Sequence, residues 1–144
     1  MAVARILKSQ IDSVQNSSPN TNILVMGDMN DEPSNKSLIE ILSAKSPGEE
    51  NTGLVNLMFP THTNKKGSYF YRGNWNMLDN IIVSADLLDN KGFQCKEKQG
   101  YVFYEKWMEY DNNNSEMSPN RTYGGPNYYG GVSDHFPVYI HLTR

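Results

Sequence analysis

Residues 23–30 decide the fold of this chain, because a short apolar run ends there in a group of polar residues. The stretch reads Ile-Leu-Val-Met-Gly-Asp-Met-Asn. Four consecutive apolar residues next to turn formers predict a buried β-strand. Gly27 ends this strand, and Asp28 and Asn30 follow where irregular backbone can expose side chains. The pattern therefore predicts a carboxylate and a carboxamide presented together at a strand end.

Two later stretches also place a polar residue beside an apolar run. Residues 77–84, Met-Leu-Asp-Asn-Ile-Ile-Val-Ser, predict a second apolar strand that carries one acid, Asp79. A carboxylate in such a strand needs a partner. Near the C-terminus, Asp134 and His135 of a Ser-Asp-His tripeptide stand just ahead of the apolar residues 138–142. We expect these three strand ends to form one acid/base site.

Simpler explanations exist for each motif taken alone. Gly, Asp and Asn are the commonest turn formers, so Gly-Asp-x-Asn can be an ordinary turn after a strand. Asp79 can be an acid at the edge of a sheet, His62 an exposed loop residue and His141 a structural residue on the last strand. The agreement of three motifs in order and in strand context favours a site.

Helices and further strands are predicted around these motifs. Residues 1–16 have the period of an amphipathic helix, and residues 34–44 predict a second helix with Ser34 as its N-cap. Residues 68–71 and 77–84 predict a β-hairpin, 85–88 one helical turn, 93–96 and 101–104 a strand pair, and 138–143 a final strand that closes the sheet. The apolar stripe of the first helix is expected to be Val3, Ile6, Leu7, Ile11 and Val14.

Residues 105–131 have no regular period and contain repeated Asn, Gly, Pro and Tyr. A long irregular stretch inside a compact domain is often functional. This one leads directly into the Ser-Asp-His motif, so we predict that it forms a wall of the active-site cleft.

Composition limits the class of protein. A chain of 144 residues is ordinarily one domain, so we expect residues 1–144 to form a single unit. The net charge of −3 disfavours a dedicated nucleic-acid binder, which usually has a basic face. The single cysteine, Cys95, rules out an intrachain disulfide and leaves the redox compartment open. No stretch is long and apolar enough to span a bilayer, and the N-terminal helix is too polar for a signal peptide.

Gly-Asp-x-Asn, then a strand with Leu-Asp-x-Ile, then Ser-Asp-His resembles the endonuclease/exonuclease/phosphatase superfamily, which cleaves phosphate esters with a divalent metal. The resemblance extends to residues 71–75 and 121–123, which look like a small-substrate or uncharacterised bacterial branch. It implies an α/β chain that corresponds to the C-terminal half of a four-layer α/β/β/α sandwich. We therefore expect one mostly antiparallel sheet with helices on one face.

The resemblance also implies a role for each site residue. Asp28 would orient or deprotonate the attacking water, and Asn30 would donate its amide to that water or to the phosphoryl group. Asp79 would accept the other ring N–H of His135. His135 would contact a phosphoryl oxygen or act as the general base, and these two roles stay open. Asp134 would reach toward the metal.

The implied cofactor is Mg²⁺, with Mn²⁺ as an alternative, because the candidate ligands are hard oxygens. Arg72 and Trp75 lie close to Asp79 in sequence, and either grip a phosphate and stack on a substrate, or serve as a solvent-facing Arg with a Trp that packs. The expected substrate is a small phosphodiester or sugar phosphate in preference to duplex DNA. The loops set substrate choice in this fold.

In the superfamily, an N-terminal half supplies an Asn and the principal metal-binding Glu. Nothing before Ile23 matches these motifs. The chain is then expected to be truncated relative to its ancestor, with Met1 internal to it and any signal peptide upstream. Its activity is expected to be impaired, or replaced by a binding role of the same cleft. An uncovered inner sheet face would favour a homodimer, strand exchange or a partner that supplies the N-terminal half.

Overall fold

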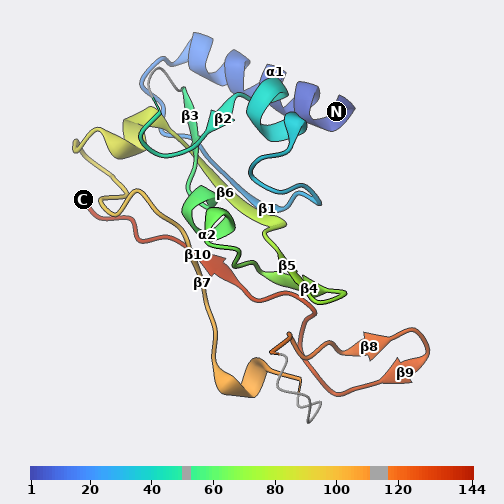
Figure 1. Cartoon of the computed structure of the whole chain (residues 1–144). Coiled ribbons are helices and arrows are strands. Elements are labelled where there is room, and N and C mark those ends of the chain that lie inside the picture. Colours follow the sequence, from blue (N-terminus) through green and yellow to red (C-terminus); the bar gives the residue numbers. More distant parts are fainter. Residues whose placement is uncertain (50–52, 111–116) are drawn as a thin grey trace.

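The two apolar strands predicted from the sequence lie side by side in a computed structural model of the chain. β1 (Leu24–Asp28) and β6 (Asp79–Ser84) are antiparallel, and Asp28 stands opposite Asp79 in their register. β3 (Leu54–Asn56) pairs antiparallel with the other side of β6, and β2 (Ala44–Lys45) runs parallel to β3. The result is a mixed four-stranded sheet in the order β1-β6-β3-β2 (Figure 1). The structure describes residues 1–49, 53–110 and 117–144.

Short helices and three two-stranded ladders complete the described part of the chain. β4 pairs with β5, β7 with β10, and β8 with β9, each time antiparallel. The helices are α1 (Ala2–Ser17), the π-helix η1 (Ser37–Ile41), α2 (Phe59–Thr63) and the 3-10 helices η2 (Ala85–Leu88) and η3 (Lys106–Met108). The ladder strands are β4 (Tyr69–Tyr71), β5 (Asn74–Asn76), β7 (Tyr101–Val102), β8 (Tyr123–Gly124), β9 (Asn127–Tyr128) and β10 (Val138–Tyr139).

One face of the sheet is covered by helices. Ile82 of β6 points to this face, where it meets Leu38 and Leu42 from the η1 region and Ile11 from α1. Ile82 and Leu42 have no exposed surface. Complete burial of such a side chain contributes about 1.5–3 kcal/mol to folding. This cluster explains why the first helix and the turn after β1 lie on the same side of the sheet (Figure 1).

The opposite face holds a second apolar cluster. Ile81 and Val83 of β6 alternate with Ile82 and therefore point away from the helices. They meet Leu57, Met58 and other buried residues, and the cluster is extended by partly buried side chains of β7, β10 and the residue after β10. Cys95 belongs to this cluster and is fully buried.

Part of each apolar surface stays exposed. On β1, Leu24 and Met26 share the face of Ile81 and Val83, yet they are 37% and 60% exposed. Only the middle of α1 packs against the sheet, through buried Ile11 and partly buried Leu7. The predicted helix is confirmed, but the predicted stripe is wrong on one flank, because the side of the helix that packs is narrower than the stripe. The exposed members of the stripe are Val3, Ile6 and Val14.

The structure corrects the predicted second helix and the predicted hairpin. The predicted helix over residues 34–44 is reduced to η1, and Ser34 is not its N-cap. The predicted hairpin of 68–71 with 77–84 is wrong, because β4 pairs with β5 across the two-residue turn Arg72-Gly73, and β6 belongs to the main sheet. Both turn residues have positive φ, 49° and 80°, which suits a tight hairpin turn.

The C-terminal prediction is wrong in its pairing. Residues 93–96 form no strand, and the final strand does not close the main sheet. Instead β10 pairs with β7, and Gln94 forms an isolated bridge to Thr143. The predicted helical turn at residues 85–88 is confirmed as η2.

The observed architecture is an α/β fold with a mixed sheet, as the sequence predicts in outline. None of the helices in the described ranges combines the length and apolar character that a bilayer crossing requires.

Candidate active site

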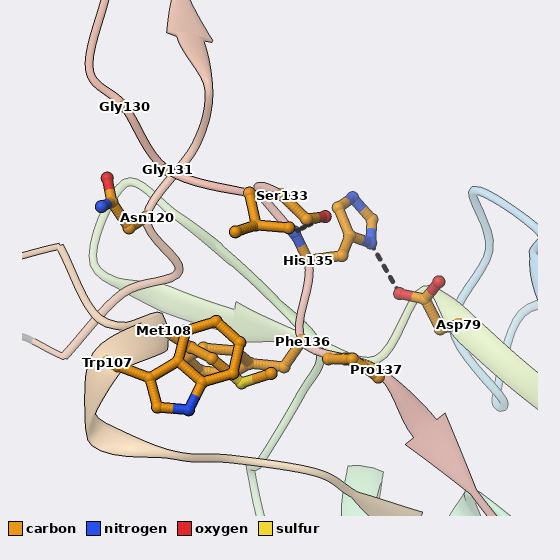
Figure 2. Close-up of a pocket in the computed structure, with 11 residues that line it drawn as sticks. Asp79, Trp107, Met108, Asn120, Gly130, Gly131, Ser133, His135, Phe136 and Pro137 are labelled. Carbon is orange, nitrogen blue, oxygen red and sulfur yellow. Dashed lines mark hydrogen bonds and ion pairs between the residues drawn. The ribbon is translucent and has the colours of Figure 1, made fainter.

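Asp79 and His135 are in direct contact although 56 residues separate them in sequence. His135 Nδ1 lies 2.6 Å from Asp79 Oδ2 (Figure 2). The Ser68 hydroxyl donates to the same oxygen at 2.5 Å. Because an ionised carboxylate can only accept hydrogen bonds, the proton of this contact belongs to Nδ1. Nε2 is therefore the ring nitrogen left for other partners.

Backbone contacts hold His135 in this position. The residue forms an isolated antiparallel bridge to Tyr69 of β4, and the two rings stack at 4.7 Å between centroids. The Phe136 N–H donates to the Ser68 carbonyl at 2.8 Å. The His135 N–H donates to Ser133 Oγ at 3.1 Å. The Ser-Asp-His segment is thus attached to the β4 region before β10 begins.

The pair is only partly accessible to solvent. The exposed fractions of the His135 and Asp79 side chains are 21% and 17%. Partial burial lowers the local dielectric, so charge interactions at this contact are stronger than in water. Because the Nδ1 proton stays in this contact, Nε2 is the atom of His135 that is placed for acid/base chemistry.

Asp28 lies at the adjacent strand end. It stands directly opposite Asp79 in the β1–β6 register, so both side chains leave the sheet on the same face. Like charges in directly opposite positions destabilise a sheet unless a cation compensates them. Asp28 Oδ1 accepts the Asn30 N–H at 2.9 Å, and Asn30 has a left-handed φ of 50°. This turn presents Asp28 and Asn30 as exposed side chains at the end of β1.

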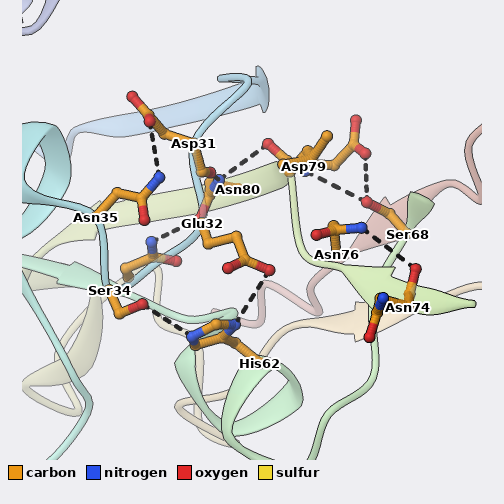
Figure 3. Close-up of polar contacts among 12 residues, drawn as sticks. Asp31, Glu32, Ser34, Asn35, His62, Ser68, Asn74, Asn76, Asp79 and Asn80 are labelled. Carbon is orange, nitrogen blue, oxygen red and sulfur yellow. Dashed lines mark hydrogen bonds and ion pairs between the residues drawn. The ribbon is translucent and has the colours of Figure 1, made fainter. Parts of the chain in front are cut away.

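Asn80 anchors the loop that follows β1. It is fully buried, and its Nδ2 donates to the Asp31 carbonyl at 2.8 Å and to the Leu78 carbonyl at 3.0 Å (Figure 3). Its Oδ1 accepts from Asn56 Nδ2 at 2.8 Å. Every polar atom of the Asn80 carboxamide is therefore used. The contact fixes the Asp28–Asn30 turn relative to β6.

Ser68 and Asn80 were not predicted from the sequence as residues of the site. The sequence around Asn80 did indicate a structural role, because an amide among apolar residues in a predicted buried strand requires hydrogen-bond partners. No pattern in the sequence indicated a role for Ser68, since that role depends on the position of Asp79 after folding.

A second polar cluster involves His62, which the sequence predicts as an exposed loop residue. It lies on α2 and is partly buried, with Nε2 hydrogen-bonded to Ser34 Oγ at 3.0 Å and Nδ1 3.8 Å from Glu32 Oε1 (Figure 3). Ser34 therefore joins two segments and does not cap η1. Asp31 accepts from Asn35 Nδ2 and Ser37 Oγ, which stabilises the start of η1. Because these contacts join segments of the fold, a structural role accounts for them.

A cavity of about 400 Å³ opens beside the Asp79–His135 pair. In Figure 2, Trp107 and Met108 lie at one end, His135 and Asp79 at the other, with Phe136 between them. The predicted cleft-forming stretch 105–131 supplies part of the wall, although its residues 111–116 lie outside the described residues. The lining residues from this stretch are Trp107, Met108, Asn120, Gly130 and Gly131.

The cavity has two notable chemical properties. None of the described residues that line it is a lysine or an arginine. Asn120 Oδ1 is buried and has no hydrogen-bond partner in the described part of the protein.

Asp28, Asn30 and the remaining predicted site residues do not line this cavity. Asp134 is exposed, next to His135 in sequence. Arg72 is at the tip of the β4–β5 hairpin, where its guanidinium lies 5.1 Å from the centre of the Tyr71 ring. Trp75 packs against Phe70 and Phe136 and lines a different cavity. His141 is exposed and contacts Glu97.

Few of the described side chains are placed to bind a metal ion. Across residues 1–49, 53–110 and 117–144, no three His, Cys, Asp or Glu side chains are grouped so that they could hold an ion. Asp28 and Asp79 provide two carboxylates on one face of the sheet, and Asp79 Oδ2 already accepts from His135 and Ser68. The described residues do not make a complete metal site by themselves.

Comparison with curated proteins and with solved structures found no match to this chain. A family model described as "Endonuclease/Exonuclease/phosphatase family" matches residues 1–144, which is the whole chain. Hydrolysis of phosphate esters, by phosphoesterases and nucleases, is the general activity of this family, and its members generally depend on a divalent metal. The match agrees with the order of the three sequence motifs and with the contact between Asp79 of the second motif and His135 of the third. The chain therefore belongs to the endonuclease/exonuclease/phosphatase family.

Proposed function

We propose that the chain carries the acid/base site of a metal-dependent hydrolase of phosphate esters. The observation that supports this most directly is the 2.6 Å contact between His135 and Asp79 beside a cavity. Asp79 holds the Nδ1 proton, so His135 Nε2 has two possible uses. As neutral imidazole it takes a proton from the attacking water, and as imidazolium it donates to a phosphoryl oxygen.

Asp28 and Asn30 complete the proposed site from the end of β1. Asp28 orients or deprotonates the water, and the Asn30 amide donates to that water or to the phosphoryl group as charge develops. The position of Asp28 opposite Asp79 supports this assignment, because it brings the two strand ends to one edge of the sheet.

The proposed cofactor is Mg²⁺, with Mn²⁺ as an alternative. Protein sites often hold Mg²⁺ with only one or two carboxylates, and water and substrate phosphate complete the shell. Asp28 and Asp134 are exposed carboxylates that could serve in this way. When bound, the ion would neutralise charge on the phosphoryl oxygens. The few ligands in the described residues support a weak site that the family's N-terminal glutamate would strengthen.

The proposed substrate is a small phosphodiester or sugar phosphate. A cavity of about 400 Å³ is within the range of small-molecule sites. Proteins that bind nucleic acid neutralise several phosphates with Lys and Arg, and none of the described residues lining this cavity is a lysine or an arginine. A small ester with one phosphate group needs fewer cations.

The direct test is hydrolysis of bis(p-nitrophenyl) phosphate. We expect release of nitrophenol that depends on added Mg²⁺ and stops on chelation with EDTA. Nitrophenol absorbance at constant pH is the measurement. Equal rates with Mg²⁺ and with EDTA would contradict a metal-dependent activity of this chain.

The alternative proposal is an inactive or ligand-binding chain. An inactive chain that gains turnover when an N-terminal half with the family's glutamate is added would favour an incomplete enzyme. Thermal stabilisation by phosphate esters without turnover would favour a binding module.

We also propose that the exposed apolar surface of β1 is covered by a second copy of the chain or by a partner that supplies the N-terminal half of the sandwich. Leu24 and Met26 continue the apolar face of Ile81 and Val83, and β1 is an edge strand. Open edges with exposed apolar side chains favour pairing with another chain. Pairing at the edge would extend the sheet, whereas burial of Leu24 and Met26 against a second sheet would give the face-to-face packing of the family's four-layer α/β/β/α sandwich.

Self-association can be tested by size-exclusion chromatography with light scattering. We expect the wild-type chain to form a dimer, and Met26→Lys to shift it toward the monomer because a charge is placed on the proposed interface. Val132→Lys is the matched control, since Val132 is also exposed but lies outside the sheet. A monodisperse wild-type monomer would contradict self-association.

A further inference from the structure

A second cavity of about 520 Å³ shares the Phe136 ring with the first. Its walls are aromatic, formed by Trp75, Tyr101, Tyr104 and Phe136. Neither Asp79 nor His135 lines it, so the proposed hydrolase site does not account for it. A volume of this size accommodates a small organic molecule.

The aromatic walls are held in place by their neighbours. Trp75 packs on Phe70, with 5.1 Å between centroids, and is stacked on Phe136 at 5.7 Å with 24° between the ring planes. Tyr101 stacks on Tyr139 at 5.4 Å. Side chains fixed in this way lose little conformational entropy when a ligand binds, which favours affinity.

Tyr104 is fixed through its hydroxyl. The O–H donates to Glu109 Oε1 at 2.5 Å, and the ring meets Phe136 edge-on at 5.5 Å. The hydrogen bond to Glu109 raises the pKa of Tyr104 above its usual value, so the group stays neutral at physiological pH. The wall of the cavity therefore carries no phenolate that would repel an anion.

The charge of the lining is positive. Of the described residues around this cavity, Lys66 alone is charged, and it makes no ion pair within the described part of the chain. The side-chain amides of Asn64 and Gln99 supply further hydrogen-bond donors. One ammonium, two amides and no carboxylate complement an anionic group.

We propose that this second cavity binds a flat aromatic anion, with its ring against Trp75 and Tyr101 and its acidic group at Lys66. Aromatic rings stack favourably on Trp and Tyr, and the ammonium attracts a carboxylate, sulfonate or phosphate. A ligand in this position contacts Phe136, whose N–H bonds to the same Ser68 that donates to Asp79. The two cavities therefore share one structural wall.

The test uses the two tryptophans of the chain as reporters. In ¹H–¹⁵N spectra, each gives one indole N–H signal, and Trp75→Phe and Trp107→Phe variants assign them. The probe is 2-naphthoate, and cyclohexanecarboxylate is the matched anion without an aromatic ring. We expect 2-naphthoate to shift the Trp75 signal saturably and to leave the Trp107 signal in place. Cyclohexanecarboxylate should bind at least about tenfold more weakly, because the stacking contribution is lost.

The neighbouring lysines provide matched variants. Lys66→Met should raise the dissociation constant of 2-naphthoate about fivefold, in line with an exposed ion pair. Lys65→Met should leave it unchanged, since Lys65 does not line the cavity. Lys66→Arg should restore binding, which excludes a folding defect as the cause. Absence of a saturable Trp75 shift, or equal effects of the two methionine variants, would overturn the proposal.

Discussion

Replacing His135 with alanine is expected to lower kcat for phosphate-ester hydrolysis by about 100- to 10,000-fold, the usual contribution of a positioned acid or base. The substitution removes the ring whose Nδ1 contacts Asp79 at 2.6 Å and whose Nε2 is available for chemistry. Asp79→Asn should also lower kcat, because a carboxamide in that position no longer holds the imidazolium by charge. Steady-state kinetics with bis(p-nitrophenyl) phosphate and Mg²⁺ measure both effects.

His141→Ala is the matched control for this experiment. His141 also contacts a carboxylate, Glu97, at 3.1 Å, but it is exposed and lines neither cavity. Its loss should leave kcat within about twofold of the wild-type value, as expected for a surface substitution. If His135→Ala and His141→Ala had the same activity, His135 would have no role in the reaction.

Replacing Asn80 with alanine is expected to lower the free energy of unfolding by about 3 kcal/mol or more. Asn80 is fully buried, and its loss leaves Asn56 Nδ2 and the Asp31 carbonyl without their partner. Each buried polar group left without a hydrogen bond costs about 1–3 kcal/mol. Chemical denaturation followed by circular dichroism measures the change.

Asn74→Ala provides the comparison for Asn80. Asn74 is exposed in the β4–β5 hairpin, and its side-chain amide donates to the nearby Arg72 carbonyl at 3.1 Å. Its loss should change stability by no more than about 0.5 kcal/mol. An Asn80→Ala variant as stable as Asn74→Ala would show that the buried carboxamide contacts are not what anchors the loop after β1.

The apolar strands were predictable because their signal is local. A run of β-branched and aliphatic residues next to Gly and Asp is enough to predict β1 and β6. The pairing of the other strands was not predictable to the same degree. The sequences of residues 101–104 and 138–143 predict strands but not the strand with which each one pairs. Their pairing with each other is set by the apolar cluster that includes Val102 and Val138, which exists only after folding.

The predictions of the helix N-cap and of the apolar stripe were wrong for a related reason. Ser34 has the right residue type and spacing for an N-cap, but its hydroxyl bonds to His62 on α2. A tertiary hydrogen bond replaced the local one that the sequence pattern predicts. Similarly, the apolar stripe of α1 is wider than the side that packs against the sheet, which carries Leu7 and Ile11.

The amino-acid sequence by itself determined the family of this protein and the identity of the three motif residues Asp28, Asp79 and His135, because residue order and chemical type are properties of the chain. Only the tertiary structure decided that Asp79 shares one carboxylate oxygen between His135 and Ser68, and that Trp75 lines a second cavity. Contacts between residues far apart in sequence depend on how the strands pair. That pairing is set by burial of apolar side chains over the whole fold, which no local pattern encodes.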